Sequence, residues 1–192
     1  MEPLSSVLFN LVIDIATLLI FLRFIMQLAA VDYFNPVVQA TVKATPVVDM
    51  FGRILPTVAN GRLNLAALVL IVLLKLIDLM GNAYLHGQPT PAPVELLIAT
   101  FLTLIQGLLR FCRYIIFGSI ILSWVTAFTN ARSPFIDVVW QLAEPLLAPF
   151  RRIMPNTGPL DFSPIIALLA IYIAEQLMRQ ATVTLLASIG SY

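Results

Sequence analysis

The 192-residue sequence has little charge, one cysteine and one histidine. Charged residues make up 11% of the chain, whereas a soluble domain contains about 25%. The single cysteine, Cys112, excludes an internal disulfide and a cluster of thiolate metal ligands. The single histidine, His86, excludes a bis-histidine haem site within one chain. The formal charge of +1 offers no argument for direct nucleic-acid binding.

The sequence also lacks the motifs of common catalytic sites. It contains no HExxH segment, no adjacent pair of aspartates and no glycine-rich phosphate loop. Ser119 and Ser123 raise the alternative of an intramembrane hydrolase, but no second histidine exists to activate them. Small hydroxyl side chains in an apolar helix more simply permit close helix packing. We therefore expect no enzyme activity, no metal site and no cofactor.

What the sequence does contain is long apolar runs, since hydrophobic residues make up 60% of the chain. A helix of about 20 apolar residues crosses a bilayer. Asn64 can cap one such helix, and Ser163 precedes a first-turn proline at the start of another. The longest run indicates a tilted helix that projects beyond the membrane. We predict four transmembrane helices, over residues 5–29, 64–85, 94–128 and 164–188.

One segment of the chain occurs twice. PVVDMFGRILP at 46–56 returns as PLLAPFRRIMP at 145–155, with proline, phenylalanine, arginine, isoleucine and proline at the same places. Each copy lies between two predicted spans, which indicates a duplicated unit of two helices. The predicted fold is therefore all-α and integral to the membrane. Its two repeats cover residues 1–90 and 91–192, with proline-rich loops at 30–63 and 129–163.

The basic residues indicate on which side of the membrane the loops lie. Lysine and arginine occur in both loops, at Lys43, Arg53 and Arg62 in the first and at Arg132, Arg151 and Arg152 in the second. The connection between the second and third spans contains neither residue type. The positive-inside rule then places both loops in the cytoplasm and both termini outside. Because each repeat contains two spans, the repeats should be parallel rather than inverted.

The loops have features of amphipathic helices. Asn35-Pro36 and Ser133-Pro134 each combine a capping side chain with a first-turn proline, and apolar stretches follow. Such helices can lie at the membrane interface, with their arginines facing lipid phosphates. The alternative is that they connect the spans, pack on the bundle and use their arginines only to set topology.

Each predicted span carries a narrow stripe of polar residues, and the four stripes should face one another. An isolated charge within the bilayer costs at least about 2.5–3.5 kcal/mol, so we expect these charges to be paired or hydrated. Spacing favours Lys75 with Asp78 and Glu175 with Arg179. The register of the duplicated segments places Arg113 opposite Asp14. The predicted intramembrane charge network consists of Asp14, Lys75, Asp78, Arg110, Arg113, Glu175 and Arg179.

Two roles are open for this network. It can act as polar glue between helices, or it can line a path for ions or protons. The near balance of positive and negative groups favours glue. Uncompensated charge at mid-membrane, or a hydrated cavity, would favour transport.

The repeated motifs resemble those of the YggT family, also called YlmG, of bacterial inner-membrane and plastid proteins. The residues that carry the resemblance are NP at 35–36, SP at 133–134, EPLLAPFRRIMP at 144–155 and GPLDFSP at 158–164. The second copy matches closely, whereas Gly52 and the segment 59–64 depart from the motif in the first copy. The motif residues are Pro36, Pro46, Arg53, Pro56, Pro134, Pro145, Arg151, Arg152, Pro155, Asp161, Phe162, Ser163 and Pro164.

The resemblance implies a membrane protein that helps other membrane machinery to assemble. Relatives are associated with osmotic tolerance and potassium balance, with cell division, and in plastids with nucleoid organisation and cytochrome b6 assembly. The implied contact surface lies on the cytoplasmic face, from Arg151 to Pro164. We expect a non-enzymatic organising factor of the bacterial inner membrane, in contact with anionic lipid headgroups, other membrane proteins or further copies of itself. The alternative is a channel or transporter component in osmotic potassium balance.

Overall fold

The computed structural model describes residues 4–89, 92–153 and 162–189 of the chain. This part contains seven helices and one hairpin of two short strands. In chain order the elements are α1 (Leu4–Leu28), α2 (Pro36–Ala44), α3 (Pro46–Gly52), β1 (Thr57–Val58), β2 (Leu63–Asn64), α4 (Leu65–Leu85), α5 (Pro93–Thr129), α6 (Pro134–Ile153) and α7 (Ser163–Ile189).

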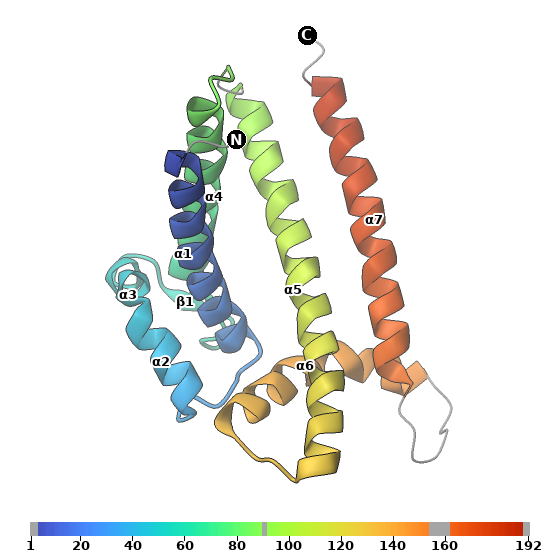
Figure 1. Cartoon of the computed structure of the whole chain (residues 1–192). Coiled ribbons are helices and arrows are strands. Elements are labelled where there is room, and N and C mark those ends of the chain that lie inside the picture. The colour runs from blue at the N-terminus through green and yellow to red at the C-terminus, as the bar shows by residue number, and fades with distance from the viewer. Residues whose placement is uncertain (1–3, 90–91, 154–161, 190–192) are drawn as a thin grey trace.

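Four long helices, α1, α4, α5 and α7, run roughly along one direction (Figure 1). Their chain directions alternate, so that the start of α1 and the end of α7 lie at the same end of the bundle (Figure 1). Each end of these helices lies within one residue of the predicted boundary. Local signals explain this accuracy, since the Asn64 side chain accepts a hydrogen bond from the Ala67 N–H and Pro93 begins α5.

Three of the long helices, α1, α4 and α5, are long and apolar enough to cross a membrane, and they indicate that the protein associates with one. The fourth, α7, has 27 residues, so its length would also suffice. Polar side chains near its centre, Glu175, Gln176, Arg179 and Gln180, lower its hydropathy. The predicted fourth span therefore stays a prediction, as does the parallel arrangement of the repeats.

Both loops contain the predicted amphipathic helices. The Asn35 side chain caps α2 by accepting a hydrogen bond from the Val37 N–H, and the Ser133 hydroxyl accepts one from the Ile136 N–H at the start of α6. Helix α6 packs against α5 and α7, while α2 lies beside α1 and α3 beside α4 (Figure 1). Both loops thus pack at the same end of the long helices.

The structure is mostly helical, and the first loop adds a small antiparallel hairpin of β1 and β2. Val58 pairs with Leu63, and the turn between them contains Ala59, Asn60 and Gly61 with positive φ. Gly61, at φ +81°, adopts this conformation without steric cost. The hairpin leads the chain directly into the cap of α4.

The two copies of the duplicated segment fold differently. In the first copy the helix breaks at Thr45, and Pro46 begins the separate helix α3. In the second copy α6 continues through Pro145 and Pro149. A buried arginine at the end of α1 explains the difference, as shown below.

Most of the buried apolar side chains in the described part of the chain form three clusters, and all three involve the loops. One joins α1 and α4 to Val48 of α3, one joins the two loops through Val38 and Val138, and one packs α6 against α5 and α7. Large apolar side chains on the long helices stay exposed, among them Leu11, Ile77 and Leu169. Such faces suit a lipid environment, where apolar exposure carries no penalty.

Candidate functional site

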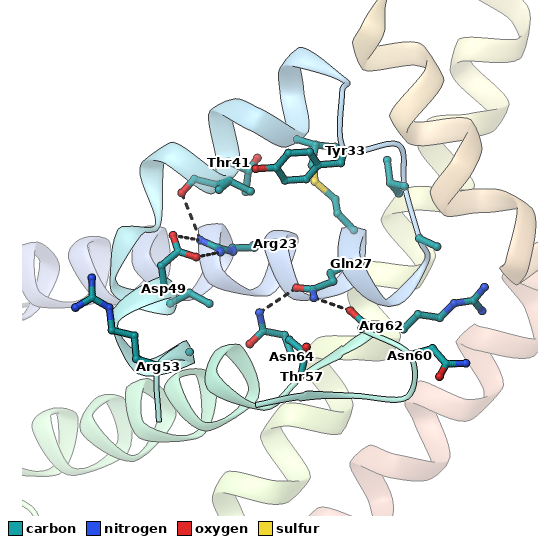
Figure 2. Close-up of a pocket in the computed structure, with 18 residues that line it drawn as sticks. Arg23, Gln27, Tyr33, Thr41, Asp49, Arg53, Thr57, Asn60, Arg62 and Asn64 are labelled. Carbon is teal, nitrogen blue, oxygen red and sulfur yellow. Dashed lines mark hydrogen bonds and ion pairs between the residues drawn. The ribbon is translucent and has the colours of Figure 1, made fainter. Parts of the chain in front are cut away.

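A polar cavity of about 710 Å³ opens where the end of α1 meets α2, α3 and the hairpin (Figure 2). Its walls combine polar side chains with apolar ones such as Met26 and Val38. It lies at the end of the long helices at which both loops pack. The cavity therefore stands where an apolar helix bundle meets its polar loops.

Arg23 is the central charge of this cavity and is 9% exposed. Its guanidinium group forms an ion pair with the carboxylate of Asp49 on α3. It also donates to the Thr45 backbone carbonyl at 2.8 Å and to the Thr45 hydroxyl at 3.1 Å. One side chain of α1 thereby holds both the junction between α2 and α3 and the first turn of α3.

This contact explains the break in the first loop helix. The Thr45 carbonyl turns toward Arg23, and the backbone at Thr45 has φ −123° and ψ 53°. In the second repeat, the register of Pro46 with Pro145 places Leu122 at the position of Arg23. Leucine offers no donor to a carbonyl, and there α6 continues through the proline.

A second set of polar contacts crosses the floor of the cavity (Figure 2). The Gln27 side chain donates to the Gly61 carbonyl at 2.7 Å and accepts from the Asn64 amide at 2.9 Å. Asn64 at the same time caps α4. These bonds fix the hairpin turn and the start of α4 to the end of α1, and they give the cavity a rigid polar floor.

Two further arginines line the cavity, and both are exposed. Arg53 and Arg62 lie at opposite ends in Figure 2, with the Arg23–Asp49 and Gln27–Asn64 contacts between them. Neither takes part in an ion pair among the residues that the structure describes. The cavity thus carries more positive than negative charge and can hold an anionic or zwitterionic group.

The second repeat has a cavity of about 540 Å³ where α5, α6 and the start of α7 meet. Its walls include Trp124, Trp140 and Phe162, and its Arg151 forms an ion pair with Glu144. This cavity is more apolar, and its arginine is already balanced by a carboxylate. The two cavities therefore differ in chemistry.

The charges of α4 form a local set. Lys75 Nζ lies 3.0 Å from the Asp78 carboxylate, as the spacing of three residues indicates. The Asn82 amide donates to the same carboxylate at 2.9 Å. These groups need no partner from another helix.

The polar stripes of α5 and α7 face each other. The Gln106 amide donates to the Thr182 hydroxyl at 2.7 Å. Two turns further along α5, Arg113 Nε lies 3.2 Å from the Glu175 carboxylate. The sequence-based pairings of Glu175 with Arg179 and of Arg113 with Asp14 are therefore wrong. Glu175 points across the seam to α5, because the helices pack closely enough there for a cross-helix contact.

A groove of about 220 Å³ lies between α1, α4 and α5. Asp14, Lys75 and Arg110 contribute charges to it, and the hydroxyl of Thr17 is buried there without a hydrogen-bond partner in the described part of the chain. Asp14 and Arg110 are exposed, and so is Arg179 on α7. The ion pairs among the described residues include none of these three.

The family-motif residues serve mainly as helix starts and connections. Pro36, Pro46 and Pro134 begin α2, α3 and α6, whereas Pro145 lies inside α6. Pro56 joins α3 to β1, Arg152 is exposed at the end of α6, and Ser163 begins α7 and is buried. Phe162 and Pro164 line the second cavity. Pro155 and Asp161 lie outside the described residues.

Sequence analysis missed the group built around Arg23, Gln27 and Asp49. The available signal was an arginine within an apolar helix, which requires a buried partner. The partner lies 26 residues away and could not be identified by helical spacing. Over the residues that are described, no group of three His, Cys, Asp or Glu side chains could hold a metal ion.

Comparison with known proteins gives the chain relatives in several bacteria. YggT of Escherichia coli K12 is 37% identical over 169 residues, which cover 86% of this chain and 84% of that protein. A Pseudomonas aeruginosa protein is 37% identical over 163 residues, or 84% and 81% of the two chains. A Vibrio alginolyticus protein is 35% identical over 178 residues, or 90% and 92%. No solved structure matches.

The family comparison confirms the resemblance and the duplication. The CCB3/YggT family model matches the chain twice, over residues 1–85 and 98–182. Each match covers one set of long helix, loop helices and long helix. The chain is therefore a duplicated member of the CCB3/YggT family.

Proposed function

We propose that this protein is a non-enzymatic organising factor that binds other membrane proteins within the bilayer. The observation that supports this role is the set of unpaired charges on the long helices. Asp14, Arg110 and Arg179 are exposed and lie outside the ion pairs of the described residues. A partner helix with complementary groups would cover them.

Energetics favour such a partner. An isolated charge in the middle of a membrane costs at least about 2.5–3.5 kcal/mol. Three such charges would raise the free energy of the isolated chain in the membrane. Contact with oppositely charged or polar groups of a partner would lower that free energy. The partner is another membrane protein or a second copy of this chain.

The proposed placement follows the charge distribution. Four spans cross a bacterial inner membrane, with both loops in the cytoplasm, both termini in the periplasm and the two repeats parallel. Through the family resemblance we link the role to osmotic stress tolerance or cell division, processes that depend on membrane assemblies.

Neutral variants test the proposal, because the partner and the isolated chain respond in opposite directions. Arg179→Gln and Asp14→Asn should lower the mass of the assembly that mild detergent extracts from membranes, as native mass spectrometry measures it. The same variants should leave the melting temperature of the isolated chain unchanged or raise it. Lys43→Gln, an exposed loop charge, is the control. A fall in melting temperature with unchanged assembly would contradict the proposal.

A second candidate function is ion movement along the groove between α1, α4 and α5. The supporting observation is that Asp14, Lys75 and Arg110 share this groove with the buried Thr17 hydroxyl, which has no hydrogen-bond partner among the described residues. A second copy could close the groove into a path. Ion flux into proteoliposomes tests this function, with Asp14→Asn and Arg110→Gln expected to change the flux and Lys43→Gln expected to leave it unchanged. Absence of flux from correctly inserted protein would reject this candidate.

A further inference from the structure

The polar cavity of the first repeat has the composition of a binding site for an amphiphile. Its apolar wall includes Met26, Val31 and Val48, and its polar side includes Arg23, Gln27 and Asn64. The apolar residues continue into the clusters that pack the end of α1. A ligand there would contact apolar and polar side chains at the same time.

The position of the cavity narrows the class of ligand. Three apolar helices indicate a membrane, and the cavity lies at the end of α1 and the start of α4. In a membrane of which these helices are spans, that level is the headgroup region. This step rests on the proposed membrane placement of the protein.

The charges of the cavity favour a phosphate group. Three arginines and one aspartate line it. Arg23 is already held by Asp49 and Thr45, so its charge is largely compensated. Arg53 and Arg62 are exposed on either side of it, and their side chains point away from each other in Figure 2. Because both are exposed, a change of rotamer would bring each guanidinium group toward a ligand between them.

Other polar residues that line the cavity can complete the contacts. The hydroxyls of Tyr33 and Thr57 and the amide of Asn60 also line the cavity. Arginine binds phosphate by charge-assisted hydrogen bonds, and hydroxyl and amide groups add neutral ones. The second cavity lacks this arrangement, since its Arg151 is paired with Glu144 and its walls are aromatic.

We propose that the cavity of the first repeat binds the phosphate headgroup of an anionic phospholipid. Arg53 and Arg62 contact the phosphate, Arg23 and Gln27 hold the cavity open, and the apolar wall accepts the glycerol backbone and the first part of an acyl chain. The Arg53 side is formed by α3 and the Arg62 side by the hairpin. A bound lipid would therefore join the two halves of the first loop.

Native mass spectrometry of the full chain, released from detergent micelles, tests this site. The probes are a short-chain phosphatidylglycerol, a phosphatidylcholine of the same chain length and soluble glycerol phosphate. The double variant Arg53→Gln/Arg62→Gln should lower phosphatidylglycerol affinity by about tenfold or more. The variant Arg53→Lys/Arg62→Lys, which keeps both charges, should retain most of the affinity.

The matched control is Lys43→Gln/Arg132→Gln, which removes two exposed loop charges outside this cavity. An equal loss of affinity in the control would show that only net charge matters and would overturn the site. If glycerol phosphate bound as tightly as the lipid, the ligand of the cavity would be a soluble phosphate ester and not a phospholipid. If phosphatidylcholine bound as tightly as phosphatidylglycerol, the site would not recognise anionic lipid and the proposal would be rejected.

The lipid site and the organising role can fail separately. The arginine variants leave Asp14, Arg110 and Arg179 intact, so they should not change the mass of the membrane-extracted assembly in mild detergent. The lipid affinity and the mass of the assembly are measured separately. Lipid binding can therefore be confirmed when the assembly proposal is rejected, and the assembly proposal can be confirmed when lipid binding is rejected. Loss of both in the arginine variants would contradict separate sites.

Discussion

Arg23 is a buried cation, and its hydrogen bonds and ion pair among the described residues all join it to the first loop. It donates two hydrogen bonds to Thr45 and forms an ion pair with Asp49. The equivalent residue in the second repeat is Leu122. The hydrogen bonds to Thr45 are buried, whereas the Asp49 side chain is 61% exposed. Water screens the Asp49 end of the contact, so the backbone contact should contribute more to stability.

Substitution of Arg23 tests this division. Arg23→Met should lower stability by about 2–3 kcal/mol, because it removes charge-assisted hydrogen bonds and leaves the Thr45 carbonyl without a donor. Asp49→Asn should cost much less, since its amide oxygen still accepts from Arg23. Thermal unfolding in detergent, followed by circular dichroism, measures both. Lys43→Met, on an exposed side chain outside the cavity, is the control. An equal effect of Asp49→Asn and Arg23→Met would contradict the stronger contribution of the Thr45 contact.

At the scale of the elements, helix starts and ends were predictable because their signals are local. Each helix start is set by a residue at the boundary itself and by its contacts with the next two or three residues, as at Asn35, Asn64 and Pro134. The break at Thr45 was not predictable, because it depends on an arginine 22 residues earlier. The partner of Glu175 was missed for the same reason, since helix packing and not sequence spacing decides it.

The seam between α5 and α7 can be tested by charge exchange. Arg113→Gln alone should destabilise the chain, because it leaves the buried Glu175 carboxylate without its cation. The exchange Arg113→Glu/Glu175→Arg should recover part of the loss. Arg110→Gln, on the same helix but outside any ion pair of the described residues, should have little effect. Melting temperatures in detergent provide the measurement, and an exchange no better than the single variants would reject the pair.

Close packing of α1 on α4 depends on Gly81. A Cβ placed there would overlap the end of the Phe9 ring, so either the ring or the helix must move. Gly81→Ala should therefore weaken the α1–α4 contact, and Phe9→Ala in the same chain should restore part of it. Gly118→Ala is the matched control, since a Cβ there meets nothing within 4 Å. Melting temperatures that add independently for Phe9 and Gly81 would contradict the contact.

At the scale of the whole molecule, the two repeats are joined through their loops as well as through their long helices. The Asn35 amide donates to the Pro134 carbonyl at 2.8 Å, and the Asp32 N–H donates to the Gln141 side chain at 2.9 Å. The same asparagine caps α2, so one side chain both starts a helix and joins the repeats. Loops that bind each other in this way must lie on the same side of any membrane that the protein crosses.

The side of the membrane on which each connection and the end of α7 lie shows whether α7 crosses the bilayer. Cys112 is the sole cysteine of the sequence, so a Cys112→Ala background permits single-cysteine labelling. Lys43→Cys and Arg132→Cys should react with an impermeant reagent from the cytoplasmic side only. Gln88→Cys and Ala187→Cys should react from the opposite side only, because an odd number of spans separates each from the nearer loop. Labelling of Ala187→Cys together with Arg132→Cys would mean that α7 does not cross. Glu175 and Arg179 would then lie outside the hydrocarbon, and the intramembrane role of Arg179 would fall with the fourth span.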